Sequence, residues 1–188
     1  MHIENVQMAD SCDASVTRNA VHSENTSISG YYVVECFSLN GALKWKDDIH
    51  NLVTTVGKNL TMDTILGNSA AGAVVMGLKG TGTANIADTQ ASHATWDEVG
   101  GTNAPTYTGT RKTPTFGAAT GGSKSTSSAV VFAMTSSGTV AGCFINIGGS
   151  ATKDDTTGTL FSAGDFTAGS KTVTSGDTLN VSYTATAA

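Results

Sequence analysis

The chain has 188 residues, which is enough for one domain with a hydrophobic core and too few for two domains of ordinary size. It contains 22 glycines but only 2 prolines, just 13% of its residues are charged, and its apolar residues come in short clusters between Gly, Ser, Thr and Asn. This composition is typical of an all-β domain with many turns and excludes a disordered chain. The net charge of -5, with ten scattered basic residues, excludes a protein whose main task is to neutralise nucleic-acid phosphates.

The three cysteines, Cys12, Cys36 and Cys143, are odd in number and far apart. This spacing argues against a disulfide framework and favours folding in a reducing compartment. No apolar run approaches the roughly 20 residues of a membrane-spanning helix. The first residues lack the basic and apolar regions of a signal peptide. We therefore expect synthesis in the cytoplasm and no membrane partner.

Residues 1–29 are polar and carry isolated apolar residues at no steady helical or strand period. Two interpretations follow: a floppy leader, or an extended arm that becomes ordered against a partner surface. We adopt the second, and predict an extended N-terminal arm over 1–29 and a single folded domain over 30–188. The apolar residues of the arm are Ile3, Val6, Met8, Val16, Val21 and Ile28.

The stretch over 30–66 has the clearest periodic pattern in the chain. Its first part alternates with period two and predicts a strand with two mostly apolar faces. Asn40-Gly41 then favours a type I′ turn, because both residues adopt positive φ angles at little cost. We therefore expect a hairpin between strands over 33–39 and 42–53. The second strand is expected to bury one face and expose the other, and the buried face carries Leu43, Trp45, Asp47 and Ile49.

After Thr55 the apolar period changes from two to near 3.6. This change predicts a short helix over 57–66. Gly67 follows the last apolar residue and is a favourable helix stop.

The middle of the chain predicts one buried strand and two strands near a sheet edge. The run AVVMGL over 73–78 is wholly apolar and lies between glycines, which suits a central strand. Residues 80–94 are expected to form a loop. The two edge strands are expected over 95–99 and 107–112, since Pro105 and Pro114 lie nearby and proline is confined to edges and strand starts.

The C-terminal part predicts the remaining strands. The segments AVVFAM over 129–134 and TVAGCFINI over 139–147 are expected to form a core hairpin through Ser136-Ser137-Gly138. Further strands are expected over 160–166, over 171–173, and at the alternating residues Leu179, Val181 and Tyr183 that follow the turn Ser175-Gly176-Asp177. Eight to ten strands and one short helix predict an all-β fold. We expect an antiparallel β-sandwich, Ig-like or jelly-roll-like, with the N-terminal arm outside it.

Histidines and paired carboxylates are the first candidates for chemistry. None of the four histidines has a second ligand at zinc-type spacing, so each is expected to be solvated or hydrogen-bonded. The pairs Asp47-Asp48 and Asp154-Asp155 are adjacent, and neighbouring side chains of a strand point to opposite faces, so neither pair forms a dyad by itself. The four histidines are His2, His22, His50 and His93.

Three further patterns are compatible with a site but incomplete. The glycine-rich run over 77–82 fits neither the Walker pattern nor the dinucleotide fingerprint, and we predict a turn. Cys36 and His50 would make a nucleophile and base on paired strands, but nothing marks an oxyanion hole or a third orienting group. The oxygen-rich loop over 149–157 would suit calcium but lacks an EF-hand pattern. We therefore predict no catalytic, metal-binding or cofactor-binding residue, no cofactor requirement, and no enzyme.

Three parts of the chain, read together, resemble a family of tailed-bacteriophage virion proteins. The first is VVECFSLNGALKWKDDIHNLVTTVGKNLTMDTIL and the second is ADTQASHATWDEV. The third combines TVAGCFINIGG, GTLFSAGDF and VTSGDTLNVSYTATA. The resemblance covers residues 30–188 and rests on structural motifs, not catalytic ones. Residues 1–29 lie outside it.

The resemblance implies an accessory virion component, most simply a capsid cement or decoration protein that stabilises the head by binding the lattice of the major capsid protein. The implied partners are the major capsid protein and further copies of this chain, as a dimer or trimer, with no direct nucleic-acid contact. The implied locations are the capsid surface and, during assembly, the host cytoplasm. A stable sandwich with polar loops and an extended element is consistent with binding to a repeated shell.

A second function class uses the same architecture. A tail-fibre or other tail-associated receptor-binding module would present aromatic-rich loops to a cell-surface glycan. Aromatic residues make up only 6% of this chain and lie mostly inside predicted strands. A hydrolase, the third class, has no assembled site in the sequence.

Overall fold

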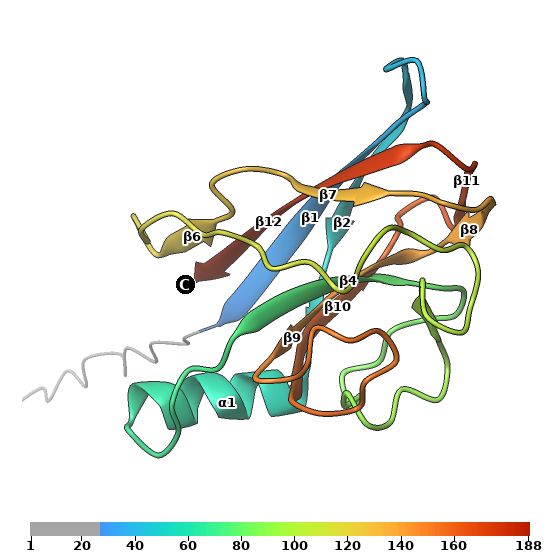
Figure 1. Cartoon of the computed structure of the whole chain (residues 1–188). Helices are drawn as coiled ribbons and strands as arrows, with labels where there is room; N and C mark the ends of the chain where they lie inside the picture. The colour runs from blue at the N-terminus through green and yellow to red at the C-terminus, as the bar shows by residue number, and fades with distance from the viewer. Residues whose placement is uncertain (1–26) are drawn as a thin grey trace, which may run out of the picture.

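The computed structural model describes residues 27–188 (Figure 1), and residues 1–26, which make up most of the predicted arm, lie outside the described residues. The described part contains twelve strands and one helix. The strands of its first half are β1 (Ile28–Phe37), β2 (Leu43–His50), β3 (Leu52–Val53), β4 (Val74–Lys79), β5 (Glu98–Val99) and β6 (Ser123–Ser125). The others are β7 (Val130–Ala133), β8 (Gly138–Val140), β9 (Gly142–Ile147), β10 (Thr159–Asp165), β11 (Lys171–Val173) and β12 (Thr178–Ala187). The helix is α1 (Thr55–Ile65).

The strands form two five-stranded antiparallel sheets and a two-stranded ribbon. Sheet A has the order β2-β1-β12-β6, and β7 also pairs with β12. Sheet B has the order β3-β10-β9-β4-β5, and the ribbon joins β11 to β8. The predicted all-β antiparallel sandwich with one short helix is confirmed. β1 begins at Ile28, so the last two residues of the predicted arm, 28 and 29, lie in sheet A.

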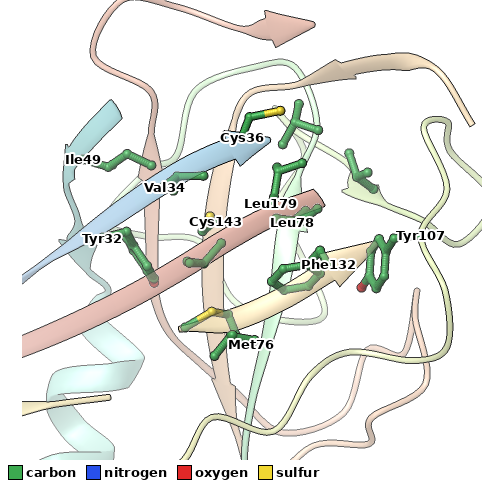
Figure 2. Close-up of a cluster of buried hydrophobic side chains, with 14 of the residues drawn as sticks. Tyr32, Val34, Cys36, Ile49, Met76, Leu78, Tyr107, Phe132, Cys143 and Leu179 are labelled. Carbon is green, nitrogen blue, oxygen red and sulfur yellow. The ribbon is translucent and has the colours of Figure 1, made fainter. Parts of the chain in front are cut away.

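The core lies between the two sheets. Side chains of β1, β7 and β12 from sheet A meet side chains of β4 and β9 from sheet B. Figure 2 shows part of this cluster, in which Tyr107 packs edge-on against Phe132 with ring centroids 5.0 Å apart. Fully buried members include Tyr32, Val34, Cys36, Ile49, Met76, Leu78, Phe132, Val140, Cys143, Leu179 and Val181.

The two sheets differ in how their outer faces are covered. Strands β1 and β2 of sheet A largely alternate between the two faces, as period-two sequences should when one face meets solvent. Leu43, predicted on the buried face, is instead 55% exposed because it lies at the end of β2 next to the turn. Strands β4 and β9 of sheet B are almost continuously buried. The reason is a second apolar cluster on the outer face of sheet B, made by Trp96, Phe144, Leu160 and Ala163. Loops therefore cover the face of sheet B that points away from the core.

The predicted hairpin between β1 and β2 is confirmed, but the predicted strand over 42–53 is divided, because β2 ends at His50 and β3 pairs with β10 in sheet B. The turn of the hairpin is also not type I′. Only Gly41 has a positive φ, of 83°, while Asn40 does not. The N–H of Gly41 donates to the carbonyl of Ser38 and the N–H of Ser38 to the carbonyl of Ala42. This is the three-residue loop in which a type I turn is followed by a left-handed glycine. The Asn40 side chain accepts a hydrogen bond from the N–H of Ala42 instead of adopting the left-handed conformation.

The predicted helix is confirmed as α1. Thr54 caps its start, because its side-chain oxygen accepts a hydrogen bond from the N–H of Gly57. The helix ends where predicted, since Leu66 closes the last turn on the carbonyl of Met62 and Gly67 has a φ of +80°. The N-terminal half of α1 packs against β10 at Gly57, the only buried residue of the helix.

The predicted edge strands were mostly wrong. Only Glu98–Val99 of the first forms a strand, β5, because residues 95–97 turn to place Trp96 in the outer cluster. The segment over 107–112 makes isolated bridges from Tyr107 and Lys112 but no strand, and Gly109 breaks it with a φ of +77°. Pro105 and Pro114 lie in connecting segments.

The predicted core hairpin over 129–147 was also wrong. β7 belongs to sheet A, where it pairs with β12, whereas β9 belongs to sheet B between β10 and β4. The chain passes from one sheet to the other through β8, and Ala141 separates β8 from β9. The glycine-rich run over 77–82 is a turn only from Gly80 onward, because Gly77 lies inside β4.

Candidate functional site

Cys36 and His50 do not form a nucleophile–base pair. In the β1–β2 ladder Cys36 is opposite Trp45, while His50 is opposite Tyr31 at the other end of the strands. Cys36 is buried in the core and His50 is exposed. Burial, together with the neighbouring carboxylate of Asp177, raises the pKa of the Cys36 thiol to about 11. A thiol in this state is protonated at neutral pH and is a poor nucleophile.

The adjacent carboxylates Asp47 and Asp48 point to opposite faces of β2 and do not act together. Asp47 is buried and forms an ion pair with Lys171 at 3.1 Å, while Asp48 is exposed on the other face of β2. Burial opposes ionisation of Asp47, but the hydrogen bond from the N–H of Thr167 and the contact with Lys171 outweigh it, and its pKa is lowered. This carboxylate fastens the outer edge of β2 to the segment that joins β10 and β11.

The pair Asp154-Asp155 shapes a loop. Asp154 accepts hydrogen bonds from the N–H of Thr102 at 2.6 Å and from its hydroxyl at 2.7 Å. Asp155 accepts from the N–H of Thr157, and hydrogen bonds from Thr157 lower the pKa of its exposed carboxyl. In residues 27–188 no three His, Cys, Asp or Glu side chains are grouped so that they could hold a metal ion.

The 149–157 loop is organised around a guanidinium group. The carbonyl of Ser150 accepts from Arg111 at 3.1 Å and the carbonyl of Asp155 accepts at 2.7 Å. The oxygen-rich composition that suggested calcium therefore surrounds a protein cation. His2 and His22 lie outside the described residues.

Arg111 forms a buried ion pair with Glu98. Its Nε lies 3.0 Å from one carboxylate oxygen of Glu98 and its Nη2 lies 2.6 Å from the other. Both side chains are at most 2% exposed. Glu98 also accepts from the N–H of Asp154 at 2.9 Å. The pair thus joins β5, the segment around 111 and the 149–157 loop, and it satisfies charges that burial would otherwise destabilise.

A second buried cation supports the same loops. Lys79, the last residue of β4, is fully buried, and its ammonium lies 2.6 Å from a carboxylate oxygen of Asp165. It also donates to the carbonyls of Gly80 and Gly82 and lies 5.6 Å from the centre of the Trp96 ring. The loop over 80–97 is therefore tied to sheet B by polar contacts as well as by its apolar cluster.

These loops surround a polar pocket of about 460 Å³, here named the loop pocket. His93 stacks on the Trp96 indole with ring centroids 4.0 Å apart, and its Nδ1 lies 2.7 Å from the Trp96 carbonyl oxygen. Gln90, 2% exposed, donates to the carbonyl of Asp155, while its Oε1 has no hydrogen-bond partner within residues 27–188. The lining residues are Gln90, Ala91, Ser92, His93, Ala94, Trp96, Asp97, Glu98, Thr102, Asn103, Asp154, Asp155 and Thr156. The pocket offers hydrogen-bonding groups and carboxylates, which suits a polar uncharged or cationic ligand.

An apolar surface lies at the end of the sandwich where α1 ends, β4 begins and β12 finishes (Figure 1). It has two hollows, of about 200 and 180 Å³, which share Val74 and Ile147 as a common wall. We name the two together the end groove. The first hollow is lined by Leu60, Thr61, Thr64, Ile65, Ala71, Gly72, Val74 and Ile147. The second is lined by Val74, Phe116, Lys124, Ile145, Ile147, Phe161, Tyr183 and Ala185.

The C-terminal end of α1 carries exposed apolar side chains, of which only Ile65 lines the end groove. Met62, Ile65 and Leu66 are 53%, 71% and 75% exposed. Three large exposed apolar side chains on one short segment are unusual for a surface with no partner, whereas single ones are ordinary. No helix of the described part of the chain is long and apolar enough to cross a membrane.

Sequence reasoning missed both the loop pocket and the end groove. The loop pocket depends on Glu98 and Arg111, which are thirteen residues apart, and single charged residues carry no pattern that pairs them. The end groove had one visible signal: the helix over 57–66 holds more apolar residues than its short contact with the sandwich can bury. Comparison with protein families, with curated proteins and with solved structures found no match.

Proposed function

We propose that this protein is a virion structural protein of a tailed bacteriophage, a capsid cement or decoration protein that binds the lattice of the major capsid protein. The sequence resemblance over 30–188 is the basis for proposing a phage virion as the particle and the major capsid protein as the partner. The observation that carries the proposal is the exposed apolar surface at the C-terminal end of α1, where Met62 and Leu66 are 53% and 75% exposed and line neither hollow of the end groove. A surface of this kind stabilises an assembly because burying it in a contact removes apolar area from water.

The rest of the domain suits attachment to a shell. The sandwich is closed by long-range β pairing, since β1 pairs with β12 along its whole length from Ile28–Ala187 to Phe37–Thr178. The outer edge strand β2 carries Lys44, Lys46 and Asp48, and charged edges discourage pairing with further strands. We expect a domain with a charged edge strand and an apolar surface at α1 to bind through that surface, and a symmetric lattice multiplies a weak contact by avidity.

Localisation in the virion tests the proposed function directly. We expect a cryo-EM reconstruction of the particle to show the sandwich on the capsid surface, with α1 toward the shell. Density confined to the tail would reject the capsid role and favour the tail-associated alternative.

A binding measurement tests the surface. The double variant Met62→Ser, Leu66→Ser removes two exposed apolar side chains from the proposed contact. We expect it to bind about a hundredfold more weakly to preformed capsids that lack this protein, since each of the two buried side chains contributes on the order of 1.5 kcal/mol. The matched control is Leu39→Ser, Leu43→Ser, which changes two exposed apolar residues, 84% and 55% exposed, at the β1–β2 hairpin. Equal loss in both variants would contradict a specific contact through α1.

The loop pocket favours a second candidate function, a tail-associated receptor-binding module. Its polar lining and the His93–Trp96 stack would suit the hydroxyl groups and ring faces of a cell-surface glycan. We expect this function to require Asn103 and Ser92, which line the pocket without taking part in the Glu98–Arg111 pair. Binding of the chain to a glycan array, lost in an Asn103→Ala, Ser92→Ala variant, would favour this module over the capsid protein.

A further inference from the structure

The end groove is an apolar surface close to the point where residues 1–26 join the sandwich. The N–H of Ser27 donates to the carbonyl of Ala188 at 2.6 Å, and the N–H of Ala188 donates to the carbonyl of Ser27 at 3.0 Å. Ile28 pairs with Ala187, two residues along β12 from Ala185, which is a wall of the second hollow. Figure 1 shows the start of β1 and the end of β12 at the same end of the molecule as the C-terminal part of α1.

We propose that the end groove binds the N-terminal segment, residues 1–26, of a second copy of this chain. The inference goes beyond the proposed function and does not depend on it, because it concerns contacts between copies of the purified protein.

The segment has the apolar residues that the two hollows require. Val6 and Met8 are two residues apart, so in an extended chain they lie on the same face about 6.8 Å from each other. The hollows are adjacent because they share the wall made by Val74 and Ile147. Each of the two side chains can enter one hollow, and neither side chain can bury itself in the short polar segment around it.

The charges of the two partners are complementary. Residues 1–26 contain four carboxylates, Glu4, Asp10, Asp13 and Glu24, against one basic side chain, Arg18. Among the described residues that line the end groove, the single charged one is a cation, Lys124. In an extended segment Glu4 and Asp10 lie on the same face as Val6 and Met8, one on each side of them. Whichever direction the segment takes, a carboxylate comes near Lys124.

The length of the segment lets it reach a second copy. Residues 1–26 join the sandwich at Ser27, whose N–H and carbonyl pair with Ala188 at the end of the β1–β12 ladder. Twenty-six residues can span up to about 85 Å, which is ample for reaching a neighbouring molecule.

Engineered disulfide formation between two different chains tests the occupant. One chain carries Cys12→Ser and either Val6→Cys or Met8→Cys, so that one of the two thiols enters the first hollow whichever direction the segment takes. The other chain lacks residues 1–26 and carries Ile65→Cys, a wall residue of the first hollow that is 71% exposed. The native cysteines of the described domain, Cys36 and Cys143, are both buried. We expect the mixed chains to form a disulfide-linked heterodimer under mild oxidation.

The matched control replaces Ile65→Cys with Leu39→Cys, an apolar residue 84% exposed at the β1–β2 turn. We expect a heterodimer yield at least tenfold lower with this control. Equal yields would overturn the proposal, and so would the absence of a heterodimer in both mixtures. A chain that carries Met8→Cys and Ile65→Cys together would overturn it by forming only an intramolecular disulfide, because the segment would then occupy its own groove.

Sedimentation of the unlinked protein provides an independent measurement. We expect the full chain to self-associate, and deletion of residues 1–26 to abolish the association. Ile65→Asp should raise the dissociation constant about tenfold or more, because it places a charge in an apolar hollow. Lys124→Glu should weaken association by a smaller factor that shrinks at high salt. Mixing Ile65→Asp, which keeps its segment, with the truncated chain, which keeps its groove, should restore a heterodimer. Failure of that pair to associate would count against binding of one chain's N-terminal segment in the end groove of another chain, whatever the protein binds in the virion.

Discussion

The loops over 80–97 and 149–157, here together named the loop cover, bury the outer face of sheet B, whereas the end groove leaves an apolar surface of the same sandwich exposed. Both involve β4: its last residue, Lys79, contacts the loop cover, and its first, Val74, is a wall of the end groove. The loop cover is closed by an apolar cluster and by two buried ion pairs. At the end groove the apolar walls remain open, and Gly57 is the one buried residue of α1. The difference indicates that the loop cover serves the stability of the domain, whereas the end groove is available to a partner.

The largest expected effect comes from breaking the loop cover. Arg111→Ala leaves Glu98 buried and unpaired and removes two hydrogen bonds to the 149–157 loop. We expect a loss of about 4 kcal/mol in the free energy of unfolding, measured by urea denaturation. Lys46→Ala, which breaks the exposed pair with Glu35, is the control and should cost less than about 0.5 kcal/mol. Similar losses in both variants would show that the buried pair is no more important than a surface one.

A second polar anchor, at Asp177, should have the next largest effect. This carboxylate is 3% exposed and accepts from the N–H of Thr174, its hydroxyl and the ammonium of Lys44. Burial opposes its ionisation, but the contacts with Lys44 and Thr174 prevail and lower its pKa. We expect Asp177→Asn to cost about 3 kcal/mol at pH 7, since it weakens hydrogen bonds to a charged group.

The pH dependence of the stability lost in Asp177→Asn follows from the direction of the pKa shift of Asp177. Because the pKa of Asp177 is lower in the folded than in the unfolded protein, its stabilisation is complete above the ordinary aspartate pKa of about 3.9. It is lost as the pH falls through the folded pKa. Urea denaturation should therefore show the difference between the original chain and Asp177→Asn shrinking below about pH 4. A difference in the free energy of unfolding that stayed constant from pH 7 to pH 2 would contradict this account. Asp48→Asn, on the exposed face of β2, is the control.

A smaller effect is expected at the one buried attachment of α1. A Cβ on Gly57 would lie 2.9 Å from the Cα of Phe161 and still closer to its carbonyl oxygen, and neither backbone atom can move cheaply. We expect Gly57→Ala to cost about 2 kcal/mol and to accelerate amide hydrogen exchange throughout α1. Asn59→Ala, at an exposed helix position, should leave exchange unchanged or slow it. Unchanged exchange in Gly57→Ala would mean that α1 is held by other contacts.

The smallest effect on stability is expected within the end groove. Ile65→Ser changes a side chain that is 71% exposed, so the free energy of unfolding should change by less than about 0.5 kcal/mol. Ile145, a wall of the same groove, is 1% exposed and packs in the core, and Ile145→Ala should cost at least about 2 kcal/mol. If thermal denaturation showed equal losses of stability for Ile65→Ser and Ile145→Ala, Ile65 would be part of the core and the groove would not be a free surface.

The amino-acid sequence by itself determined the features that depend on neighbouring residues. Period-two alternation placed β1, β2 and β12, the change of period after Thr55 placed α1, and Gly67 marked its end. These signals are local because a strand or helix repeats its environment every two or 3.6 residues. The all-β class follows from them and from the composition, and it needs no knowledge of which strands pair.

The tertiary structure alone decided pairing, irregular segments and both surfaces. The sequence could not show that β7 and β9 join different sheets, because two apolar strands beside a turn look alike whether they pair with each other or not. The prolines that flank the segment over 107–112 indicate an edge strand, yet the guanidinium of Arg111 turns inward to reach Glu98. The loop pocket and the end groove are likewise assembled from residues far apart in the chain. Ion pairs and hollows of this kind depend on distances in space, and no periodic pattern along the chain encodes them.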